Sequence, residues 1–274
     1  MALLPVHSFF SLNGVLLPKS EFVASENDGG IYEVVRVEQG IPLFWEEHMG
    51  RFYRSAEIAR KTICFKPLEI AQFIADLIDK NEVYTGNILI SYRKNLKAFF
   101  IPHNYPSAEQ YSRGVDCGIL YAERNNPNAK VFQTEVRTKA NQIISEQKVY
   151  EVVLVDRENK VTEGSRSNLF FIRGEEIFTP RASNVLLGIT REKALKCAQE
   201  IDVKVEEKDI LLAGLSDFDA AFISGTSPKI LPVKNIGASS FKTDNPVLRK
   251  LMQQYDLMID NYIAQKKGNH PFHK

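Results

Sequence analysis

The chain contains little cysteine and no extended block of basic residues, and each shortage argues against a class of protein. Its three cysteines, Cys64, Cys117 and Cys197, lie in apolar contexts without the spacing of a metal site. An odd and sparse count argues against a disulfide framework and is typical of a reducing compartment. Basic residues form no block longer than pairs such as Lys266-Lys267, and the formal net charge is +1. Nucleic acid is therefore a poor candidate as a partner.

Long apolar runs are also missing. No stretch approaches the roughly 18 apolar residues that a membrane-spanning helix requires. The opening residues MALLPVHSFFSLNG lack the basic start of a secretory signal. We therefore expect a cytoplasmic protein that has no membrane partner. A length of 274 residues fits one large domain or two small ones.

The first 110 residues predict a small α+β domain. Residues 8–17 predict a hairpin that turns at Asn13-Gly14, a dipeptide typical of two-residue β-turns. Pro67 begins a helix, because apolar residues recur after it at helical spacing. The other elements expected here are strands at 31–37, 43–45, 87–93 and 96–101 and a helix at 46–60.

Residues 114–274 predict a larger domain that mixes strands and helices. The polar stretch 104–113, broken by proline, serine and glycine, is the predicted linker in front of it. The expected strands are 115–121, 150–156, 168–172, 177–179, 203–205, 220–224 and 230–233, and the expected helices are 131–147, 190–200 and 246–266.

The segment from Tyr150 to Asn168, which reads YEVVLVDRENKVTEGSRSN, is the centre of this second part. Its first residues form a short apolar strand, and Arg157 to Lys160 form a polar turn. Glu163 then brings one carboxylate out of a second apolar run. A buried carboxylate is costly without a compensating partner, usually a cation, so this residue is a candidate for a functional site.

At this point the chain resembles the class IV aminotransferases, the fold-type IV enzymes that use pyridoxal 5'-phosphate. The family includes branched-chain and D-amino-acid aminotransferases and aminodeoxychorismate lyase. The matching pieces are YEVVRV (32–37), EEHMGRFYRSAE (46–57), NAK (128–130), VTEGSRSNLFFI (161–172), LLGITRE (186–192) and ISGTSPKILPV (223–233). Each piece alone is weak, but together they cover residues 30 to 235 in the family's order.

The resemblance implies a two-domain fold like that of D-amino-acid aminotransferase, with a small N-terminal α+β domain and a larger mixed α/β pseudo-barrel. It also implies a homodimer and a lysine whose amine forms a Schiff base with the cofactor. Lys130 matches the family's spacing to Glu163 without a gap, and it follows a loop. Lys139 is the alternative, but it falls in the middle of the predicted helix, where a solvated lysine is the simpler interpretation.

The same resemblance implies the roles of the residues that bind the cofactor. Glu163 pairs with the pyridine nitrogen, and Asn168 orders the glutamate loop. Ile189 and Thr190, at a predicted helix N-terminus, bind the phosphate, where free N–H groups favour anions. Arg51 and Thr226 add further phosphate donors.

The simpler interpretations are a solvated turn carboxylate for Glu163, an N-cap for Thr190, a surface arginine for Arg51 and a strand-end turn for Thr226. His48 has no second ligand near it in the sequence, so we interpret it as structural and expect no metal.

The substrate residues implied are Tyr32, Arg93 and Ser227. In strand 31–37, Tyr32 shares a face with Val34 and Arg36 by the period of two. Arg93 and Ser91 share a face in the later strand. An apolar pocket with a cationic rim predicts an amino acid with a medium apolar side chain, and 2-oxoglutarate as the amino acceptor.

No subfamily matches cleanly. Branched-chain enzymes carry a tyrosine five residues after the lysine, where this chain has Glu135. D-amino-acid enzymes carry an Arg-x-His pair that the segment 93–97 lacks, and the lyases read Phe-Thr-Thr where this chain has Tyr32-Glu33-Val34. A D-amino-acid aminotransferase, an aminodeoxychorismate lyase that eliminates pyruvate, and a non-catalytic binding protein therefore remain open.

Overall fold

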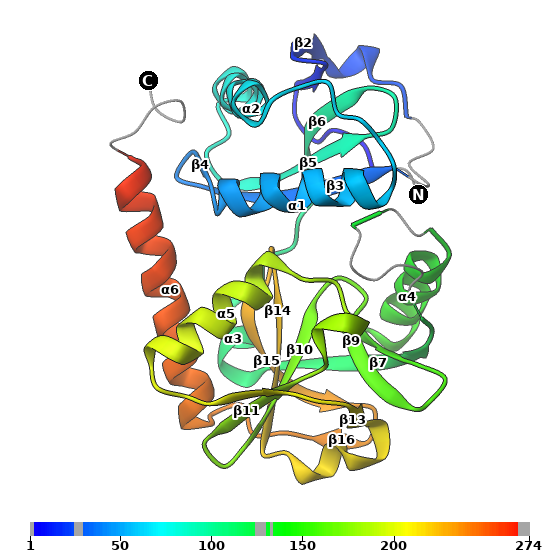
Figure 1. Ribbon diagram of the computed structural model, residues 1–274, viewed down its shortest axis with the longest axis vertical. Helices are drawn as coiled ribbons and strands as arrows, with labels where there is room; N and C mark the ends of the chain where they lie inside the picture. Colours follow the sequence, from blue (N-terminus) through cyan, green and yellow to red (C-terminus); the bar gives the residue numbers. More distant parts are fainter. Residues whose placement is uncertain (1–2, 25–29, 124–129, 132–133, 268–274) are drawn as a thin grey trace. The chain divides into compact units, whose positions relative to one another are not determined.

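The computed structural model describes residues 3–24, 30–123, 130–131 and 134–267 (Figure 1). They divide into two compact units. The first unit contains the described part of residues 1–104, together with Lys130, Val131 and the chain from Ile259 onward. The second contains residues 105–123 and 134–258. Two segments that the sequence analysis assigns to the C-terminal domain thus belong by their contacts to the first unit.

The first unit is built on a six-stranded antiparallel sheet of order β2-β1-β6-β5-β3-β4. Its strands are β1 (Phe9–Leu12), β2 (Val15–Pro18), β3 (Ile31–Glu38), β4 (Ile41–Pro42), β5 (Gly86–Tyr92) and β6 (Leu96–Ile101). Asn13 and Gly14 close the first hairpin with φ of 52° and 87°. Asparagine and glycine tolerate positive φ at both central positions, so the predicted hairpin is confirmed.

Two helices, α1 (Trp45–Ile58) and α2 (Pro67–Asn81), share a core with one face of this sheet. Ile31, Val35 and Val37 of β3 point into that core, as the period of two requires. The alternate residue Tyr32 belongs to a second cluster with Leu89 and Phe99. The members of the first core cluster on the helices include Trp45, Met49, Phe52, Ile70, Ile74 and Leu77.

One strand prediction for this part of the chain is wrong, and the predicted linker has a structure of its own. The expected strand at 43–45 does not form, because Phe44 takes a left-handed conformation, with φ of 53°, and Trp45 already begins α1. The expected linker 104–113 contains the helix α3 (Ala108–Arg113). A capping box starts this helix: Ser107 accepts a hydrogen bond from the Gln110 N–H, and the Gln110 side chain accepts one from the Ser107 N–H.

The C-terminal part of the helix α6 (Pro246–Lys266), from Ile259, belongs to the first unit. The Tyr262 hydroxyl accepts a hydrogen bond from the Trp45 N–H at 3.0 Å and donates one to Glu46 at 3.0 Å. Lys266 forms an ion pair with Glu46 as well. These contacts secure the first turn of α1, whose N-cap residue offers no side-chain hydrogen bond.

The second unit is built on a ten-stranded mixed sheet of order β12-β11-β10-β14-β15-β7-β8-β9-β13, with β16 added on β15. Its strands are β7 (Val115–Tyr121), β8 (Glu151–Val155), β9 (Lys160–Gly164), β10 (Asn168–Arg173), β11 (Glu176–Thr179), β12 (Val205–Glu207), β13 (Ile210–Leu211), β14 (Ala220–Gly225), β15 (Lys229–Ile236) and β16 (Ser239–Ser240). Its core is an apolar cluster that includes Val153, Phe171, Phe178, Ile223 and Leu231. Each unit combines a sheet with helices, and the α+β fold class is as predicted.

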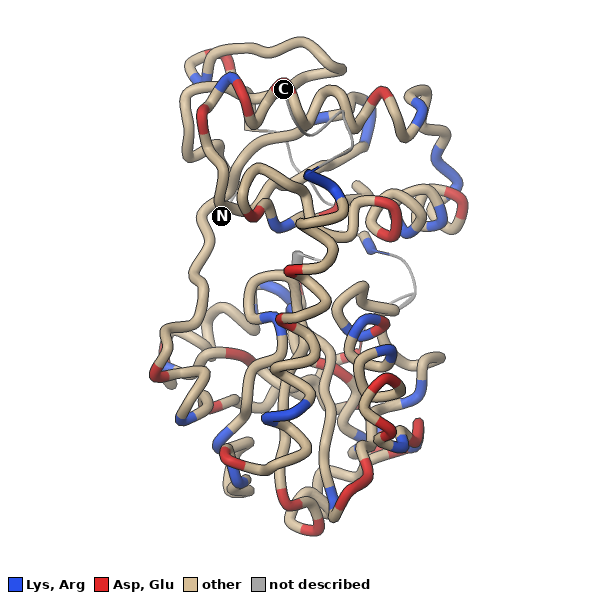
Figure 2. The backbone as a smooth tube through the Cα atoms, turned by 90° about the vertical axis from the view of Figure 1, so that its left-hand side faces the viewer, with Lys and Arg blue, Asp and Glu red and all other residues tan. Residues whose placement is uncertain are grey.

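Helices of the second unit lie beside this sheet. The helix α4 (Thr134–Gln147) contacts β7 and β8, and α5 (Ile189–Glu200) contacts β14 and β15. Short 3-10 helices occupy Lys19–Glu21, Ala182–Asn184 and Leu212–Asp217. No helix among the described residues is long and apolar enough to cross a membrane. Figure 2 shows acidic and basic residues interspersed along the backbone of each unit.

Candidate active site

The strands β8 and β9 form an antiparallel pair that carries Glu163 near its end. The side chain of Glu163 is only 3% exposed, so the sequence places a carboxylate in the interior here. A tight turn follows, in which the Gly164 N–H donates to the Ser167 carbonyl at 2.8 Å. Asn168 then begins β10 and is buried as well.

Glu163 and Asn168 both hold the main chain of Leu186. The Leu186 N–H donates to Glu163 Oε2 at 3.2 Å, and Asn168 Nδ2 donates to the Leu186 carbonyl at 2.8 Å. Since Leu186 lies just before α5, the two side chains fix the segment that leads into this helix. Three stretches that are separated in sequence are thereby brought together, as the candidate site requires.

The start of α5 has the features of an anion site. Gly188 is its N-cap and, without a side chain, makes no capping hydrogen bond. A Cβ on Gly188 would collide with Asn168 Oδ1, so only glycine permits this approach. The N–H groups of Ile189 and Thr190 precede the first helical hydrogen bond, from the Glu192 N–H to the Gly188 carbonyl. Such N–H groups and the helix dipole favour a bound anion.

The end of β14 lies beside the same residues. Ser224 is opposite Asn168 in the pairing of β14 with β10. Its hydroxyl is buried and has no hydrogen-bond partner among the residues that the structure describes. Gly225, Thr226 and Ser227 follow, and the last two are half-buried. An orphaned buried hydroxyl is costly and is explained by a ligand or water at this position.

Lys130 is held by the first unit. Its N–H donates to the Ser55 hydroxyl at 3.2 Å, and its carbonyl accepts from the Tyr32 N–H at 3.1 Å. Its Nζ lies 4.9 Å from the centre of the Tyr32 ring. The competing Lys139 is exposed on α4 and pairs with Glu135 at 2.7 Å, one helical turn away. These contacts match the interpretation of Lys139 as a solvated helix lysine.

Arg51 lies in a buried network that the sequence analysis did not foresee. Its Nε and Nη2 donate to the two carboxylate oxygens of Glu33 at 2.7 and 2.6 Å. His48 Nδ1 lies 2.8 Å from Glu33 Oε2. Burial raises the pKa of Glu33, but the charge and hydrogen bonds of Arg51 and His48 outweigh it and hold this pKa at about 2. The Arg51 guanidinium thus forms a bidentate, charge-assisted pair with this carboxylate.

Burial lowers the pKa of His48, and the positive charges of Arg51 and Lys130 lower it further, while the hydrogen bond and charge of Glu33 act in the opposite direction. Among the described residues no group of three or more histidine, cysteine, aspartate or glutamate side chains could hold a metal ion. The partner that the structure shows for the His48 ring is the carboxylate of Glu33.

The predicted substrate residues lie in the first unit, apart from Ser227. Tyr32 is buried and lies opposite Ser91 in the pairing of β3 with β5. Arg93 follows the end of β5, in the exposed turn of residues 93–95 that leads into β6. It therefore does not share a strand face with Ser91 as predicted, because β5 ends one residue earlier, at Tyr92. Arg36 contacts Glu38 at 3.0 Å.

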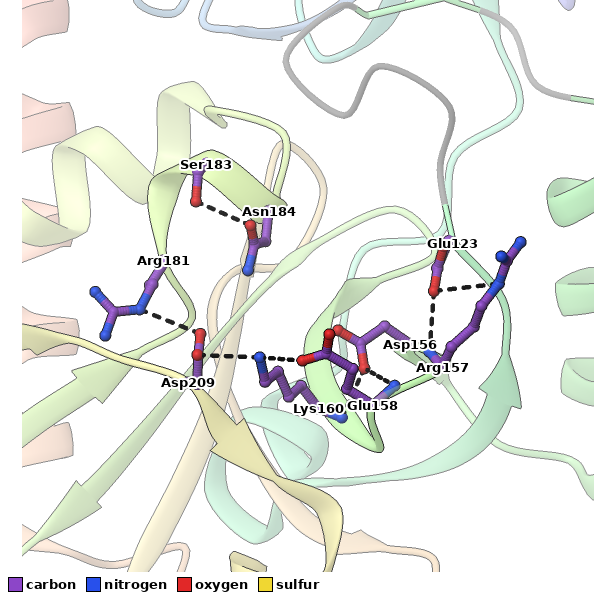
Figure 3. Close-up of polar contacts among 9 residues, drawn as sticks. All are labelled: Glu123, Asp156, Arg157, Glu158, Lys160, Arg181, Ser183, Asn184 and Asp209. Carbon is purple, nitrogen blue, oxygen red and sulfur yellow. Dashed lines mark hydrogen bonds and ion pairs between the residues drawn. The ribbon is translucent and has the colours of Figure 1, made fainter.

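Ion pairs and hydrogen bonds surround the turn of the β8–β9 hairpin, and we assign them a structural role (Figure 3). Asp209 contacts both Lys160 and Arg181 at 3.2 Å, and Asp156 accepts the N–H groups of Glu158 and Lys160 at 2.9 and 2.8 Å. Most of these side chains are exposed, and solvent screens exposed ion pairs, so they add little to stability. Their effect is to close the hairpin turn.

Comparisons with known proteins agree with this geometry. The family model described as amino-transferase class IV matches residues 30–236, and the chain belongs to that family. A D-alanine aminotransferase of Bacillus licheniformis is 27% identical over 85% of this chain and 90% of its own length. A probable branched-chain-amino-acid aminotransferase of Thermotoga maritima is 28% identical over 85% and 87%.

Solved structures of branched-chain amino acid aminotransferases share the fold. The Escherichia coli enzyme has a TM-score of 0.82 at 21% identity, over 92% of this chain and 95% of that one. The Thermobaculum terrenum enzyme, in its PLP form, has a TM-score of 0.79 at 21% identity, over 96% and 97%. The protein is thus an aminotransferase of class IV, and enzymes of this class use pyridoxal 5'-phosphate.

The described residues fit this cofactor. A buried carboxylate suits a protonated ring nitrogen, and the uncapped start of α5 suits a phosphate. The orphaned hydroxyl of Ser224, next to Gly225 and Thr226, is a further donor in the same unit. When bound, the cofactor supplies the electron sink, and the protein supplies binding, orientation and electrostatics.

Sequence reasoning missed two buried carboxylates, Glu33 and Glu151. Glu33 lies between Tyr32 and Val34 in β3, Glu151 begins a strand whose other residues are apolar, and the structure buries them to 0% and 3% exposure. A carboxylate inside an apolar strand requires charged or hydrogen-bonding partners, and this signal was present in the sequence. Arg51 and His48, three residues apart on one helix face, were the available partners of Glu33.

Proposed function

We propose that this enzyme transfers the amino group of an amino acid with a medium apolar side chain to a 2-oxo acid such as 2-oxoglutarate. The observation that carries the aminotransferase assignment is the double anchoring of Leu186 by Glu163 and Asn168 in front of the uncapped α5. The apolar preference rests on β3 and β5, where Val34 lies opposite Leu89 beside Tyr32.

In this proposal each residue has one task. The Lys130 amine binds the cofactor and, once released by substrate, acts in its neutral form as the general base at the substrate α-carbon. The Glu163 carboxylate keeps the ring nitrogen protonated, and Asn168 holds the adjoining loop. The phosphate is bound by the N–H groups of Ile189 and Thr190 and by the Thr226 hydroxyl.

Arg51 and the substrate residues complete the assignment. The Arg51 guanidinium, held by Glu33, is assigned as a further donor to the phosphate. Tyr32 contacts the substrate side chain, Ser227 contacts its carboxylate, and Arg93 provides the positive charge for the second carboxylate of glutamate. The exposed position of Arg93 suits a group that has to serve two different substrates in turn.

A D-amino-acid aminotransferase is the second candidate, since a D-alanine aminotransferase is among the relatives. The turn between β5 and β6 counts against this candidate. Tyr92 pairs with Leu96, so the turn has three residues, 93–95, and it lacks the histidine of the Arg-x-His pair that D-amino-acid enzymes carry. A screen of half-reactions separates the candidates: L- and D-amino acids are added in turn to the purified enzyme, and the cofactor absorbance is followed. We expect conversion by apolar L-amino acids and L-glutamate. Preference for D-alanine, or pyruvate release from aminodeoxychorismate without an acceptor, would assign the chain to a sister subfamily.

The cofactor lysine can be located directly. We expect borohydride reduction of the yellow enzyme to fix the cofactor on Lys130, because its backbone is bonded to both β3 and α1, whereas Lys139 pairs with Glu135 on the surface. Peptide mapping by mass spectrometry measures the position. A Lys139→Arg variant is the control and should label normally. A label on Lys139 in the native enzyme would contradict the assignment.

The rim role of Arg93 makes a separate prediction. We expect Arg93→Ala to raise the KM for glutamate and 2-oxoglutarate about tenfold or more, and to change the KM for an apolar amino acid less than about twofold. A tenfold change corresponds to about 1.4 kcal/mol, a reasonable value for one charge-assisted contact. Lys94→Ala, the adjacent exposed cation, is the matched control. Equal losses for both substrates would rule out this role.

We also propose a homodimer, since closed two-fold dimers are the most common oligomers of soluble enzymes and the family resemblance implies one. Sedimentation equilibrium at nanomolar concentration, together with an activity assay, tests this, and a fully active monomer would refute it. The cytoplasm remains the proposed location, on the strength of three free cysteines in the described chain.

A further inference from the structure

The buried carboxylate of Glu151 has no task in the assignments above, yet it accepts four hydrogen bonds. Its Oε1 accepts from the Val152 N–H at 2.8 Å and from the Ser165 hydroxyl at 2.7 Å. Its Oε2 accepts from the Arg166 N–H at 3.1 Å and from the Ser167 hydroxyl at 2.9 Å. Three of the four donors belong to residues 165–167, the turn that joins Glu163 to Asn168.

All four donors are neutral, and each one points at the carboxylate. The two oxygens of a carboxylate offer enough acceptor sites for all four donors. The carboxylate of Glu151 is therefore the centre on which the turn is assembled.

The turn has little freedom to adopt another arrangement. A Cβ on Gly164 would collide with Ser167 Oγ and would lie 3.1 Å from Glu151 Oε2. The Ser165 N–H donates to the Val152 carbonyl at 2.8 Å, which ties the turn to β8. The backbone thus wraps closely around the carboxylate, and a displacement at residues 165–167 displaces both neighbours, Glu163 and Asn168.

From this geometry we infer that Glu151 is a positioning residue for the reaction: it sets the turn that aims Glu163 at the cofactor ring nitrogen. The inference rests on the proposed role of Glu163. The link is short, because Glu163 and Asn168 flank the turn and together hold the N–H and carbonyl of Leu186. Loss of the Glu151 carboxylate would loosen this connection without removing any group that touches the cofactor.

Glu151→Gln tests the inference with little change in size. The two carboxylate oxygens each accept one backbone N–H, from Val152 and Arg166. An amide has one acceptor oxygen, so in either orientation its NH2 group faces one of these donors. A buried donor then loses its partner, which weakens the turn. We expect the half-reaction to slow about tenfold and the pH titration of the cofactor absorbance to shift in the same direction as in Glu163→Gln.

A double-mutant cycle separates positioning from general destabilisation. In the Glu163→Gln background, Glu151→Gln should slow the half-reaction by less than about twofold, because the carboxylate that it positions is already gone. A second readout needs no turnover: hydrogen exchange of the full chain, in the peptide that covers residues 162–168, should become about tenfold faster in Glu151→Gln. Asp156→Asn is the control, since Asp156 accepts two backbone N–H groups at the other end of the same hairpin. It should alter neither the cofactor titration nor this exchange.

The outcomes distinguish the two ideas. If Glu163→Gln alone leaves the rate and the titration unchanged, the proposed role of Glu163 is wrong. Two results would overturn the positioning role even if Glu163→Gln acts as expected. In the first, Glu151→Gln leaves the half-reaction rate and the titration unchanged. In the second, Glu151→Gln slows the Glu163→Gln enzyme by the same factor as it slows the wild type. If Glu151→Gln does not fold, Ser167→Ala decides, since it removes only one donor. That variant should slow the half-reaction about threefold with the same titration shift, and a native rate and titration would again overturn the inference.

Discussion

Replacement of Glu163 by glutamine should slow transamination by about 100-fold or more while the enzyme still binds its cofactor. A glutamine oxygen can keep the hydrogen bond from the Leu186 N–H, so the loop before α5 stays in place. In the proposed role of Glu163, the variant would lose the negative charge that favours a protonated ring nitrogen, and the electron sink would weaken. A loss of about 2.7 kcal/mol in transition-state stabilisation accounts for a hundredfold change. Single-turnover absorbance changes measure the rate, and cofactor titration measures binding.

Glu158→Gln provides the matched control for this experiment. Glu158 lies in the turn of the same β8–β9 hairpin, its side chain is 72% exposed, and its ion pair is with Lys160. Its replacement should change the rate less than about twofold. A near-native rate in Glu163→Gln would show that the buried carboxylate serves the loop alone, and the assignment of the ring-nitrogen partner would have to be withdrawn.

Replacement of Glu33 by glutamine should lower the free energy of unfolding at pH 7 by about 3–5 kcal/mol, the usual range when one partner of a buried ion pair is removed. The Arg51 guanidinium would stay buried against a neutral amide, because both oxygens of Glu33 now accept its N–H groups. Urea unfolding of the wild type and the variant measures the loss. Glu38→Gln, on the same strand and paired with Arg36, should cost less than Glu33→Gln, because the Glu38 side chain is 24% exposed and that of Glu33 is 0% exposed.

The same residue predicts how stability depends on pH. The pKa of Glu33 is about 2 in the folded enzyme, against 4.5 for an unperturbed glutamate. The unfolded chain therefore takes up the proton first, and the stabilisation present above about pH 4.5 is lost as the pH falls toward 2. His48, whose pKa burial lowers, adds a loss that begins below about pH 6.5.

Unfolding midpoints between pH 7 and pH 3 measure this acid dependence. We expect the wild-type curve to fall steeply below pH 4.5 and the Glu33→Gln curve to be flatter there. A Glu33→Gln enzyme with wild-type stability at pH 7 and an unchanged acid slope would contradict the ion-pair account. A combined Glu33→Gln and Arg51→Met variant should regain part of the stability, because the guanidinium is no longer buried against a neutral amide.

The sequence by itself determined the local elements and the order of the motifs. The Asn13-Gly14 hairpin, the helix that begins at Pro67 and the strand that carries Glu163 follow from turn chemistry, a fixed φ and hydrophobic period, all of which depend on neighbours in the chain. The family resemblance followed from residues in linear order as well. It led to the aminotransferase class that the family model confirms.

Only the tertiary structure decided which groups, distant in the sequence, form hydrogen bonds or ion pairs with a buried carboxylate. Glu33 is 18 residues from Arg51, and Glu151 is 16 from Ser167, so no local rule selects these partners. A carboxylate in an apolar strand is visible in the sequence, but packing chooses whether a guanidinium, a hydroxyl or an N–H group meets it. Lys130 is a similar case: it joins the strands of the first unit because its backbone completes hydrogen bonds with Tyr32 and Ser55. Buried polar groups must be satisfied, and the folded chain satisfies them with whichever donors the core brings within reach.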